Sequence, residues 1–126
     1  MSGRPRQIRV FLCDDAPELR ALTRCRLERD PALLVVGEAG DGEAAVALIA
    51  QLCPDVVLLD LSMPNVDGME ALPRVLDAAP DARVIVYSGL AAHRVAAIAL
   101  ERGAHRYLEK GESAERIREV VHEVAA

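Results

Sequence analysis

The chain has 126 residues, which is enough for one domain with a buried core and too few for a second. Aromatic residues make up only 2% of it and Trp is absent, so few rings are available to stack on nucleobases. The formal net charge of -5 argues against a general attraction to nucleic acid or anionic membranes, because that attraction needs clustered Lys and Arg.

Cysteine usage and hydropathy point to a soluble protein of the cytoplasm. Cys13, Cys25 and Cys53 are odd in number and lack CxxC spacing, so we interpret them as reduced core thiols. No apolar run approaches the roughly 20 residues that a membrane span requires. Residues 1–7 also lack the apolar centre of a signal peptide.

The first strand and helix are predicted from an apolar run followed by a proline. Residues 8–13 are apolar apart from one Arg and lead into Asp14 and Asp15, which indicates a buried strand with two acids at its carboxyl end. Pro17 suits a helix start, and the helix is expected to run to about Arg29. We expect its inward face to contain Leu19, Leu22 and Leu27.

The same alternation continues to the end of the chain. Val56 to Asp60 reads as a central strand covered on both faces, because four consecutive apolar residues precede the acid. Pro73 lies inside the next helical pattern and predicts a late start or a bend. Further strands are expected at 33–39, 83–88 and 105–109, and further helices at 43–52, from 69 to before Pro80, at about 92–102 and from 113 onward.

The last two helices differ in how much apolar surface they offer. The helix at 92–102 is rich in Ala, so we expect it to be the least firmly packed and a candidate for movement. Its expected anchors are Val95, Ile98 and Leu100, and those of the final helix are Ala114, Ile117, Val121 and Val124.

Five strand patterns that alternate with five helical patterns predict a single α/β domain over residues 1–126, with a core of about 8–125. The expected fold is a flavodoxin-like, doubly wound parallel sheet with strand order 2-1-3-4-5. In such a sheet, ligands bind outside the carboxyl ends of the strands, where strands 1 and 3 meet.

Five polar side chains are expected at that edge: Asp14, Asp15, Asp60, Ser88 and Lys110. Three carboxylates in one crevice repel one another unless a cation neutralises them, which indicates a hard divalent ion bound through oxygen, with Mg²⁺ the best fit. A Lys and a Ser beside a metal-bound Asp are suited to hold the oxygens of an incoming phosphoryl group.

With these residues in order, the whole chain resembles the response-regulator receiver domain of two-component signalling. The family has an acidic pair after strand 1, an aspartate after strand 3 with a following Met-Pro-x-x-x-Gly, a Ser or Thr after strand 4, and a Lys after strand 5 with an aromatic residue three positions earlier. The corresponding residues here are Asp14 and Asp15, Asp60, Met63-Pro64 to Gly68, Ser88, Lys110 and Tyr107.

The resemblance implies that Asp60 accepts a phosphoryl group from the phosphohistidine of a sensor histidine kinase. It implies Mg²⁺ held by Asp15, Asp60 and the backbone carbonyl of Ser62, with Asp14 acting mainly through metal-bound water. It also implies that Lys110 and Ser88 bind phosphoryl oxygens, and that Ser88 and Tyr107 form the switch. Such a chain is not a conventional enzyme, although it catalyses its own phosphorylation and a slow dephosphorylation.

The output implied by the resemblance is a changed surface on the fourth helix, fifth strand and fifth helix. Residues 36–39 with Asp41-Gly42, and Gly103-Ala104 ahead of Tyr107, resemble the NarL-like branch of transcriptional regulators. We expect no recognition helix and no direct nucleic acid or membrane binding by this chain. Signalling is then expected through a homodimer, a downstream protein partner or an output domain.

Two departures from the family pattern concern loops. Gly89 stands where Ala usually follows the hydroxyl residue, and Gly111 stands where Pro often follows the Lys. They affect the expected loop conformation and the switching equilibrium more than the charged set.

Two other functions fit part of the pattern. A Mg²⁺-dependent phosphatase of the haloacid dehalogenase type also uses a strand-end Asp, although its usual second Asp would fall at Ser62. A pseudo-receiver that only binds proteins would not need the intact acidic set. The histidines, His93, His105 and His122, lack partners at metal-site spacing, so we interpret them as ordinary surface residues.

Overall fold

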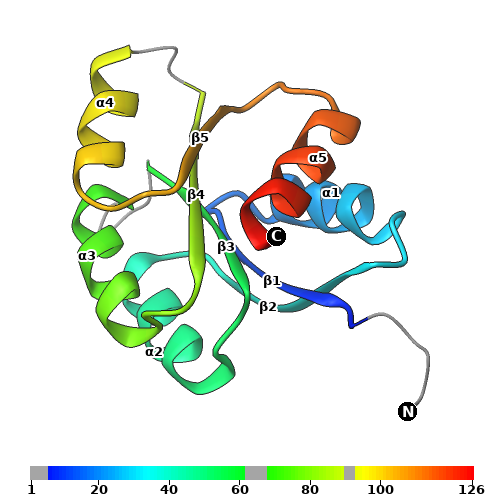
Figure 1. The fold of residues 1–126 in the computed structure, drawn as a ribbon, viewed down its shortest axis with the longest axis horizontal. Helices are drawn as coiled ribbons and strands as arrows, with labels where there is room; N and C mark the ends of the chain where they lie inside the picture. The colour runs from blue at the N-terminus through cyan, green and yellow to red at the C-terminus, as the bar shows by residue number, and fades with distance from the viewer. Residues whose placement is uncertain (1–5, 62–67, 90–92) are drawn as a thin grey trace.

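The computed structural model describes residues 6–61, 68–89 and 93–126 of the chain. Within these ranges, five parallel strands alternate with five helices, and the strands form one sheet in the order β2-β1-β3-β4-β5 (Figure 1). This confirms the predicted doubly wound, flavodoxin-like topology. The elements are β1 (Ile8–Cys13), α1 (Pro17–Glu28), β2 (Leu33–Ala39), α2 (Gly42–Leu52), β3 (Val56–Asp60), α3 (Gly68–Ala78), β4 (Arg83–Ser88), α4 (His93–Glu101), β5 (Arg106–Glu109) and α5 (Ala114–Ala125).

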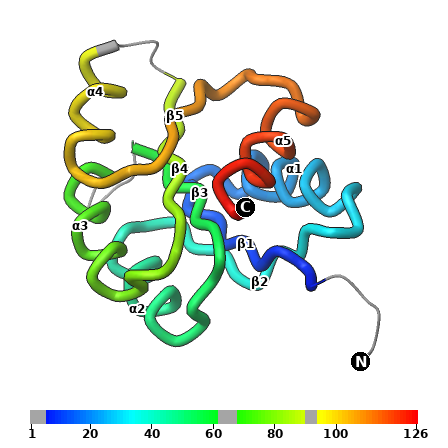
Figure 2. The backbone as a smooth tube through the Cα atoms, viewed as in Figure 1, coloured from blue at the N-terminus to red at the C-terminus, as the bar shows by residue number. Residues whose placement is uncertain are grey.

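The helices cover both faces of the sheet. Helices α1 and α5 lie together on one side, and α2, α3 and α4 lie on the other (Figure 2). The apolar core is divided in the same way, because successive strand residues point to opposite faces. Val10 and Leu12 pack with Leu27 of α1, whereas Phe11 packs with Ile49 of α2. None of the helices in the described ranges is long and apolar enough to cross a membrane.

Strand β3 lies in the middle of the sheet and is buried along its whole length. It pairs with β1 on one side and β4 on the other, and all five of its residues from Val56 to Asp60 are buried. A parallel strand with both faces covered needs apolar residues at consecutive positions, which is the pattern that predicted it. Asp60 is therefore a carboxylate at the end of the most protected strand.

A β-bulge interrupts the pairing of β1 with β2. Val10 pairs with Val35, but the next residue, Phe11, pairs with Gly37, so Val36 is the extra residue on β2. Gly37 is required here because a Cβ would come within 2.8 Å of the Phe11 ring and 2.7 Å of Leu52. The bulge and this glycine let β2 continue beside the bulky Phe11.

The predicted inward face of α1 is wrong in part. Leu27 is fully buried, but Leu19 and Leu22 are 45% and 44% exposed. At about 100° per residue, Leu22 and Leu27 point about 140° apart around the helix, so both cannot face the sheet. Leu19 and Leu22 instead line a small cavity of about 80 Å³ beside Ile117 of α5.

Helix α4 shows a similar difference. Ile98 and Leu100 are 38% and 46% exposed, whereas Ala99 is fully buried and Val95 packs against the core. Val95 and Ala99 are four residues apart and therefore lie on the same face of the helix. Position around the helix, and not side-chain size, thus determines which residues of α4 are buried. The expectation of a lightly anchored α4 agrees with Ala99 as its one fully buried residue in the described structure.

The remaining helix predictions need smaller corrections. Pro73 was expected to cause a late start or a bend in this helix. Helix α3 begins at Gly68, so the late start is not found, and the proline lies inside the helix. Ser113 caps α5 by accepting a hydrogen bond from the backbone N–H of Arg116. On α5, Ile117 and Val124 are partly buried and Val121 is fully buried, as expected. Val120, which was not predicted to face inward, is also fully buried.

Two interpretations of isolated residues also change. Cys13 is buried as predicted, but Cys25 and Cys53 are exposed and are not core thiols. His105 is half-buried, and its Nδ1 accepts a hydrogen bond of 2.9 Å from the backbone N–H of Val84, so it is not an ordinary surface histidine.

Candidate functional site

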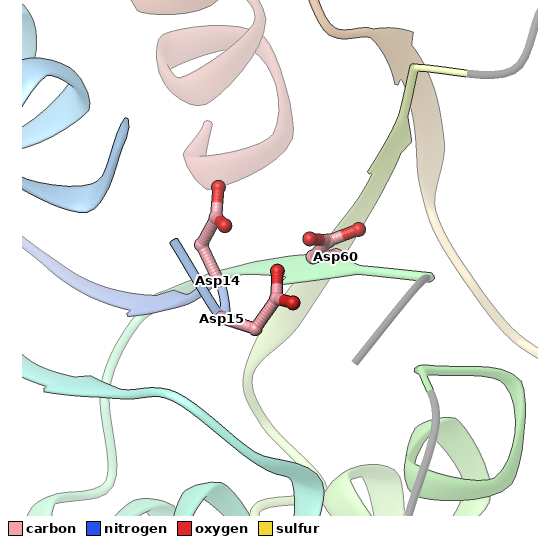
Figure 3. A group of neighbouring side chains, drawn as sticks. All are labelled: Asp14, Asp15 and Asp60. Atoms are coloured by element: carbon pink, nitrogen blue, oxygen red, sulfur yellow. The ribbon is translucent and has the colours of Figure 1, made fainter. Parts of the chain in front are cut away.

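The predicted polar residues come together at one edge of the sheet. Asp14 follows β1, Asp60 ends β3, Ser88 ends β4 and Lys110 follows β5. Because the strands are parallel, their carboxyl ends share this edge, and Figure 3 shows the three carboxylates gathered at the ends of β1 and β3. The structure brings the side chains of Asp14, Asp15, Asp60 and Lys110 together at this edge, and the backbone N–H of Lys110 donates to the carbonyl oxygen of Ser88.

The three aspartates form a compact acidic cluster. One carboxylate oxygen from each of Asp14, Asp15 and Asp60 lies within 4.8 Å of the others. Asp14 and Asp60 are 1% and 0% exposed, whereas Asp15 is exposed. Carboxylate oxygens are hard ligands, so the donor set suits a hard cation that would relieve the mutual repulsion.

Lys110 supplies a positive charge to the cluster. Its Nζ lies 2.7 Å from Oδ2 of Asp60 and 3.6 Å from Oδ2 of Asp14. Burial alone would lower the pKa of Lys110, but the hydrogen bond with Asp60 and the neighbouring carboxylate charges raise it above its ordinary value. The Lys110 side chain is therefore positively charged at neutral pH, and its ammonium group forms an ion pair with the Asp60 carboxylate.

Asp14 is held in place by contacts with the protein. Oδ1 accepts a 3.0 Å hydrogen bond from the backbone N–H of Ala16, and Oδ2 accepts one of 2.8 Å from the hydroxyl of Tyr87. Its backbone carbonyl accepts a 2.6 Å hydrogen bond from Nη1 of Arg20. Both carboxylate oxygens of Asp14 therefore accept hydrogen bonds within the protein, whereas Asp15 is the exposed member of the cluster.

Tyr87 is a site residue that the sequence analysis missed. It is 7% exposed, and its ring lies 5.2 Å from Nζ of Lys110. Burial and the nearby charge of Asp14 raise the pKa of Tyr87, so its hydroxyl remains a donor. The available signal was a tyrosine in an otherwise apolar buried strand, because a buried phenol needs a hydrogen-bond partner.

Arg20 was also missed. Besides contacting Asp14, its Nε lies 3.2 Å from Oε1 of Glu38 on β2. Gly40 leaves room for it, since a Cβ there would lie 3.2 Å from Nη1 of Arg20. An arginine near the start of α1 and an acid in β2 carry no sequence signal of this contact, because the contact depends on how the two elements pack.

Ser88 and Tyr107 are linked directly. Ser88 is 2% exposed, and its side chain hydrogen-bonds the hydroxyl of the half-buried Tyr107. Burial, followed by the charge of Glu109, raises the pKa of Tyr107 in spite of that hydrogen bond. The two residues predicted to form the switch are therefore already in contact in this structure.

Part of the predicted site lies outside the described residues. This applies to Ser62, whose carbonyl was predicted to bind the metal, and to Met63-Pro64 of the family motif. Gly68, the last residue of that motif, is described and is buried at the start of α3. Its backbone N–H lies 3.3 Å from the carbonyl oxygen of Leu61.

Comparison with known proteins supports the receiver interpretation. The sequence profile of the response regulator receiver domain matches residues 10–122. The nitrate/nitrite response regulator protein NarL of Escherichia coli K12 is 36% identical over 117 residues, which are 93% of this chain and 54% of NarL. The chemotaxis protein CheY of Listeria monocytogenes is 31% identical over 118 residues, which are 94% of this chain and 98% of CheY.

Two solved structures share the fold closely. The signal receiver domain of a Mycobacterium tuberculosis response regulator named NarL superposes with a TM-score of 0.91 at 35% identity, covering 96% of this chain and 98% of that one. The response regulator domain of Thermotoga maritima CheB gives a TM-score of 0.88 at 30% identity, covering 95% and 97%.

These matches favour the receiver over the dehalogenase-type phosphatase. The chain spans about half the length of NarL, which extends beyond the matched residues. The match to the family covers most of the chain and agrees with the acidic edge of the sheet. The chain therefore belongs to the response regulator receiver domain family of two-component signalling.

Proposed function

We propose that Asp60 accepts the phosphoryl group and that this modification switches the domain. The observation that carries the proposal is the position of Lys110 Nζ, 2.7 Å from Oδ2 of Asp60, inside a cluster with Asp14 and Asp15. In the transfer, the bond from phosphorus to the imidazole nitrogen of a kinase phosphohistidine breaks. A bond from phosphorus to a carboxylate oxygen of Asp60 forms, and the imidazole leaves with the electron pair.

The proposed metal is Mg²⁺, which suits a small set of carboxylate oxygens and retains several waters. Asp15 and Asp60 would hold it together with the backbone carbonyl of Ser62. Asp14, whose oxygens accept hydrogen bonds from Ala16 and Tyr87, would act mainly through metal-bound water, as the family resemblance implies. When bound, the ion neutralises charge that builds up on the phosphoryl oxygens.

The protein's own groups have distinct roles in the proposed reaction. Lys110 binds an oxygen of the incoming phosphoryl group and offsets its charge, while remaining next to the nucleophile. The Ser88 hydroxyl binds a second oxygen. Because Ser88 also contacts Tyr107, movement of Ser88 towards the phosphate changes the environment of Tyr107 on β5.

The proposed output is a change in the α4–β5–α5 surface, read by a partner protein, a second copy or an appended output domain. Helix α4 is suited to move because its fully buried anchor is only Ala99 within the described structure. NMR spectra with and without beryllofluoride and Mg²⁺ test this. Unchanged resonances of Ser88, Tyr107 and α4 would contradict the coupling.

The phosphorylation itself is tested with phosphoramidate or acetyl phosphate and Mg²⁺. Mass spectrometry should detect one added phosphoryl group on the wild-type chain and none on Asp60→Asn or in excess EDTA. Asp81→Asn is the matched control, since Asp81 is an exposed acid that precedes β4 at the opposite edge of the sheet. Equal labelling of Asp60→Asn and wild type would falsify the assignment.

A further inference from the structure

The ammonium group of Lys110 has two acidic neighbours, and its position depends on which of them holds it. Oδ2 of Asp60 is 2.7 Å from Nζ, and Oδ2 of Asp14 is 3.6 Å away. Both carboxylates are buried, so their interactions with a cation are only weakly screened. Some other contact must keep Asp14 from drawing Lys110 away from Asp60.

Tyr87 makes that contact. Its hydroxyl donates to the same Asp14 oxygen, Oδ2, at a distance of 2.8 Å. The phenol ring also lies under Lys110, with Nζ 5.2 Å from the ring centroid, which is within the range of a cation–π interaction. Tyr87 is on β4 and is the register partner of Asp60 on β3, so this single side chain contacts Asp14 and Lys110 next to the nucleophile.

We propose that Tyr87 is a positioning residue that directs Lys110 to Asp60, by occupying Oδ2 of Asp14 and by supporting the ammonium group with its ring. This inference rests on the proposed phosphorylation of Asp60. Without the hydroxyl, Oδ2 of Asp14 loses its donor, and the nearest cation available to replace it is Lys110. The ammonium group is then shared between two carboxylates and binds an incoming phosphoryl oxygen less well.

If Tyr87 positions Lys110, replacing Tyr87 should slow phosphoryl transfer much more than it weakens Mg²⁺ binding. Phosphoryl transfer should slow by about tenfold in Tyr87→Phe, which corresponds to the loss of one hydrogen bond to a charged group. Mg²⁺ affinity should change by less than about threefold, because Asp15 and Asp60 are untouched. Tyr87→Leu removes the ring as well and should slow the transfer further.

The experiment measures the rate of labelling by phosphoramidate at saturating Mg²⁺ and, separately, the Kd for Mg²⁺ by titration. The two Tyr87 variants are compared with wild type and with Val121→Ala, a buried residue on the same side of the sheet that lies outside the site. Val121→Ala reports the effect of lost core packing alone. The ¹⁵N resonance of the Lys110 ammonium group should shift in Tyr87→Phe and not in Val121→Ala.

Three outcomes would overturn the positioning role. They are a labelling rate in Tyr87→Phe within twofold of wild type, an equal loss of rate and Mg²⁺ affinity, or an unchanged Lys110 resonance. These results differ from failure of the proposed function, in which the wild-type chain itself is not labelled or Asp60→Asn is labelled equally. The Lys110 resonance needs no phosphorylation, so it tests the contact even in that case.

Discussion

Gly68 lies against the main chain of Asp60 so closely that a Cβ at position 68 would come within 2.1 Å of the Asp60 carbonyl oxygen. The same Cβ would lie 2.5 Å from Cα of Leu61. Both contacts are with backbone atoms, which cannot rotate away as a side chain can. The glycine of the family motif is therefore needed here for a close approach to the main chain of Asp60.

Gly68→Ala should consequently displace the end of β3 or the start of α3. We expect a loss of about 1–3 kcal/mol in the free energy of unfolding, measured in urea, together with slower labelling of Asp60. Gly89→Ala is the matched control, since a Cβ there meets no atom of the described residues within 4 Å. That control should leave the free energy of unfolding unchanged or slightly raised. Equal stability of the two variants would argue against the close approach.

Mg²⁺ should stabilise the folded chain through the acidic cluster. A ligand that binds only the folded state adds about 2.7 kcal/mol at a hundredfold excess over its Kd. The midpoint of thermal unfolding should therefore rise with Mg²⁺ in the wild type and much less in Asp15→Asn. Asp81→Asn should respond as the wild type does. A full response in Asp15→Asn would show that the exposed aspartate does not hold the ion.

Arg20 should matter more for stability than the neighbouring Arg24, although both contact Glu38. Arg20 is 20% exposed and also donates to the backbone of Asp14, whereas Arg24 is 46% exposed. We expect Arg20→Ala to lower the free energy of unfolding by about 1–3 kcal/mol and Arg24→Ala by less than about 1 kcal/mol.

Arg20→Lys tests the same contact more finely. It should not restore stability, because one ammonium group cannot reproduce the two separate nitrogen contacts of the guanidinium. Urea unfolding of the three variants measures both effects. Full recovery with Lys would mean that charge alone is sufficient.

His105 should make stability depend on pH. Its Nδ1 accepts the N–H of Val84, and burial together with the charge of Arg83 lowers the pKa of His105 below its ordinary value. As the pH falls below about 6.5, the unfolded chain takes up a proton before the folded chain does. The stabilising contribution of neutral His105 is thus present above that pH and is lost as the pH falls towards the lowered value.

Urea unfolding between about pH 5 and pH 7.5 measures this contribution. His105→Gln can still accept a hydrogen bond but does not titrate, so its stability should fall less over the same range. In the wild type, ¹⁵N NMR should find the ring proton on Nε2. A proton on Nδ1 at neutral pH would be incompatible with the contact to Val84.

The strands could be predicted from the sequence because buried parallel strands are short, continuous apolar runs with polar ends. This applies to Val56–Asp60 and to Arg83–Ser88, whose bounds agree with the prediction. The acidic edge followed from those strand ends, since parallel strands bring their carboxyl ends together. Topology alone was sufficient to bring Asp14 and Asp60 close to each other.

Contacts that depend on packing could not be predicted in this way. Tyr87 reaches Asp14 from β4 past the intervening β3, and no spacing along the chain encodes that reach. The exposure of Leu22 and Ile98 has a related cause, because the angle at which a helix meets the sheet decides which apolar residues are buried. Where the sheet covers only one narrow stripe of a helix, the apolar character of a residue does not by itself predict that it is buried.

The bulge at Val36 changes which face of the sheet the odd-numbered residues of β2 point to. Before it, Val35 faces the side of α1 and α5, and after it Ala39 faces the opposite side, although both numbers are odd. The same reversal turns Glu38 towards Arg20. Deleting Val36 would therefore remove the bulge without changing which way the later residues face, since Val35 and Gly37 would then be adjacent residues of a regularly alternating strand. Glu38 should therefore stay with Arg20 after deletion of Val36, whereas insertion of one residue between Gly37 and Glu38 would turn Glu38 to the other face and separate the pair.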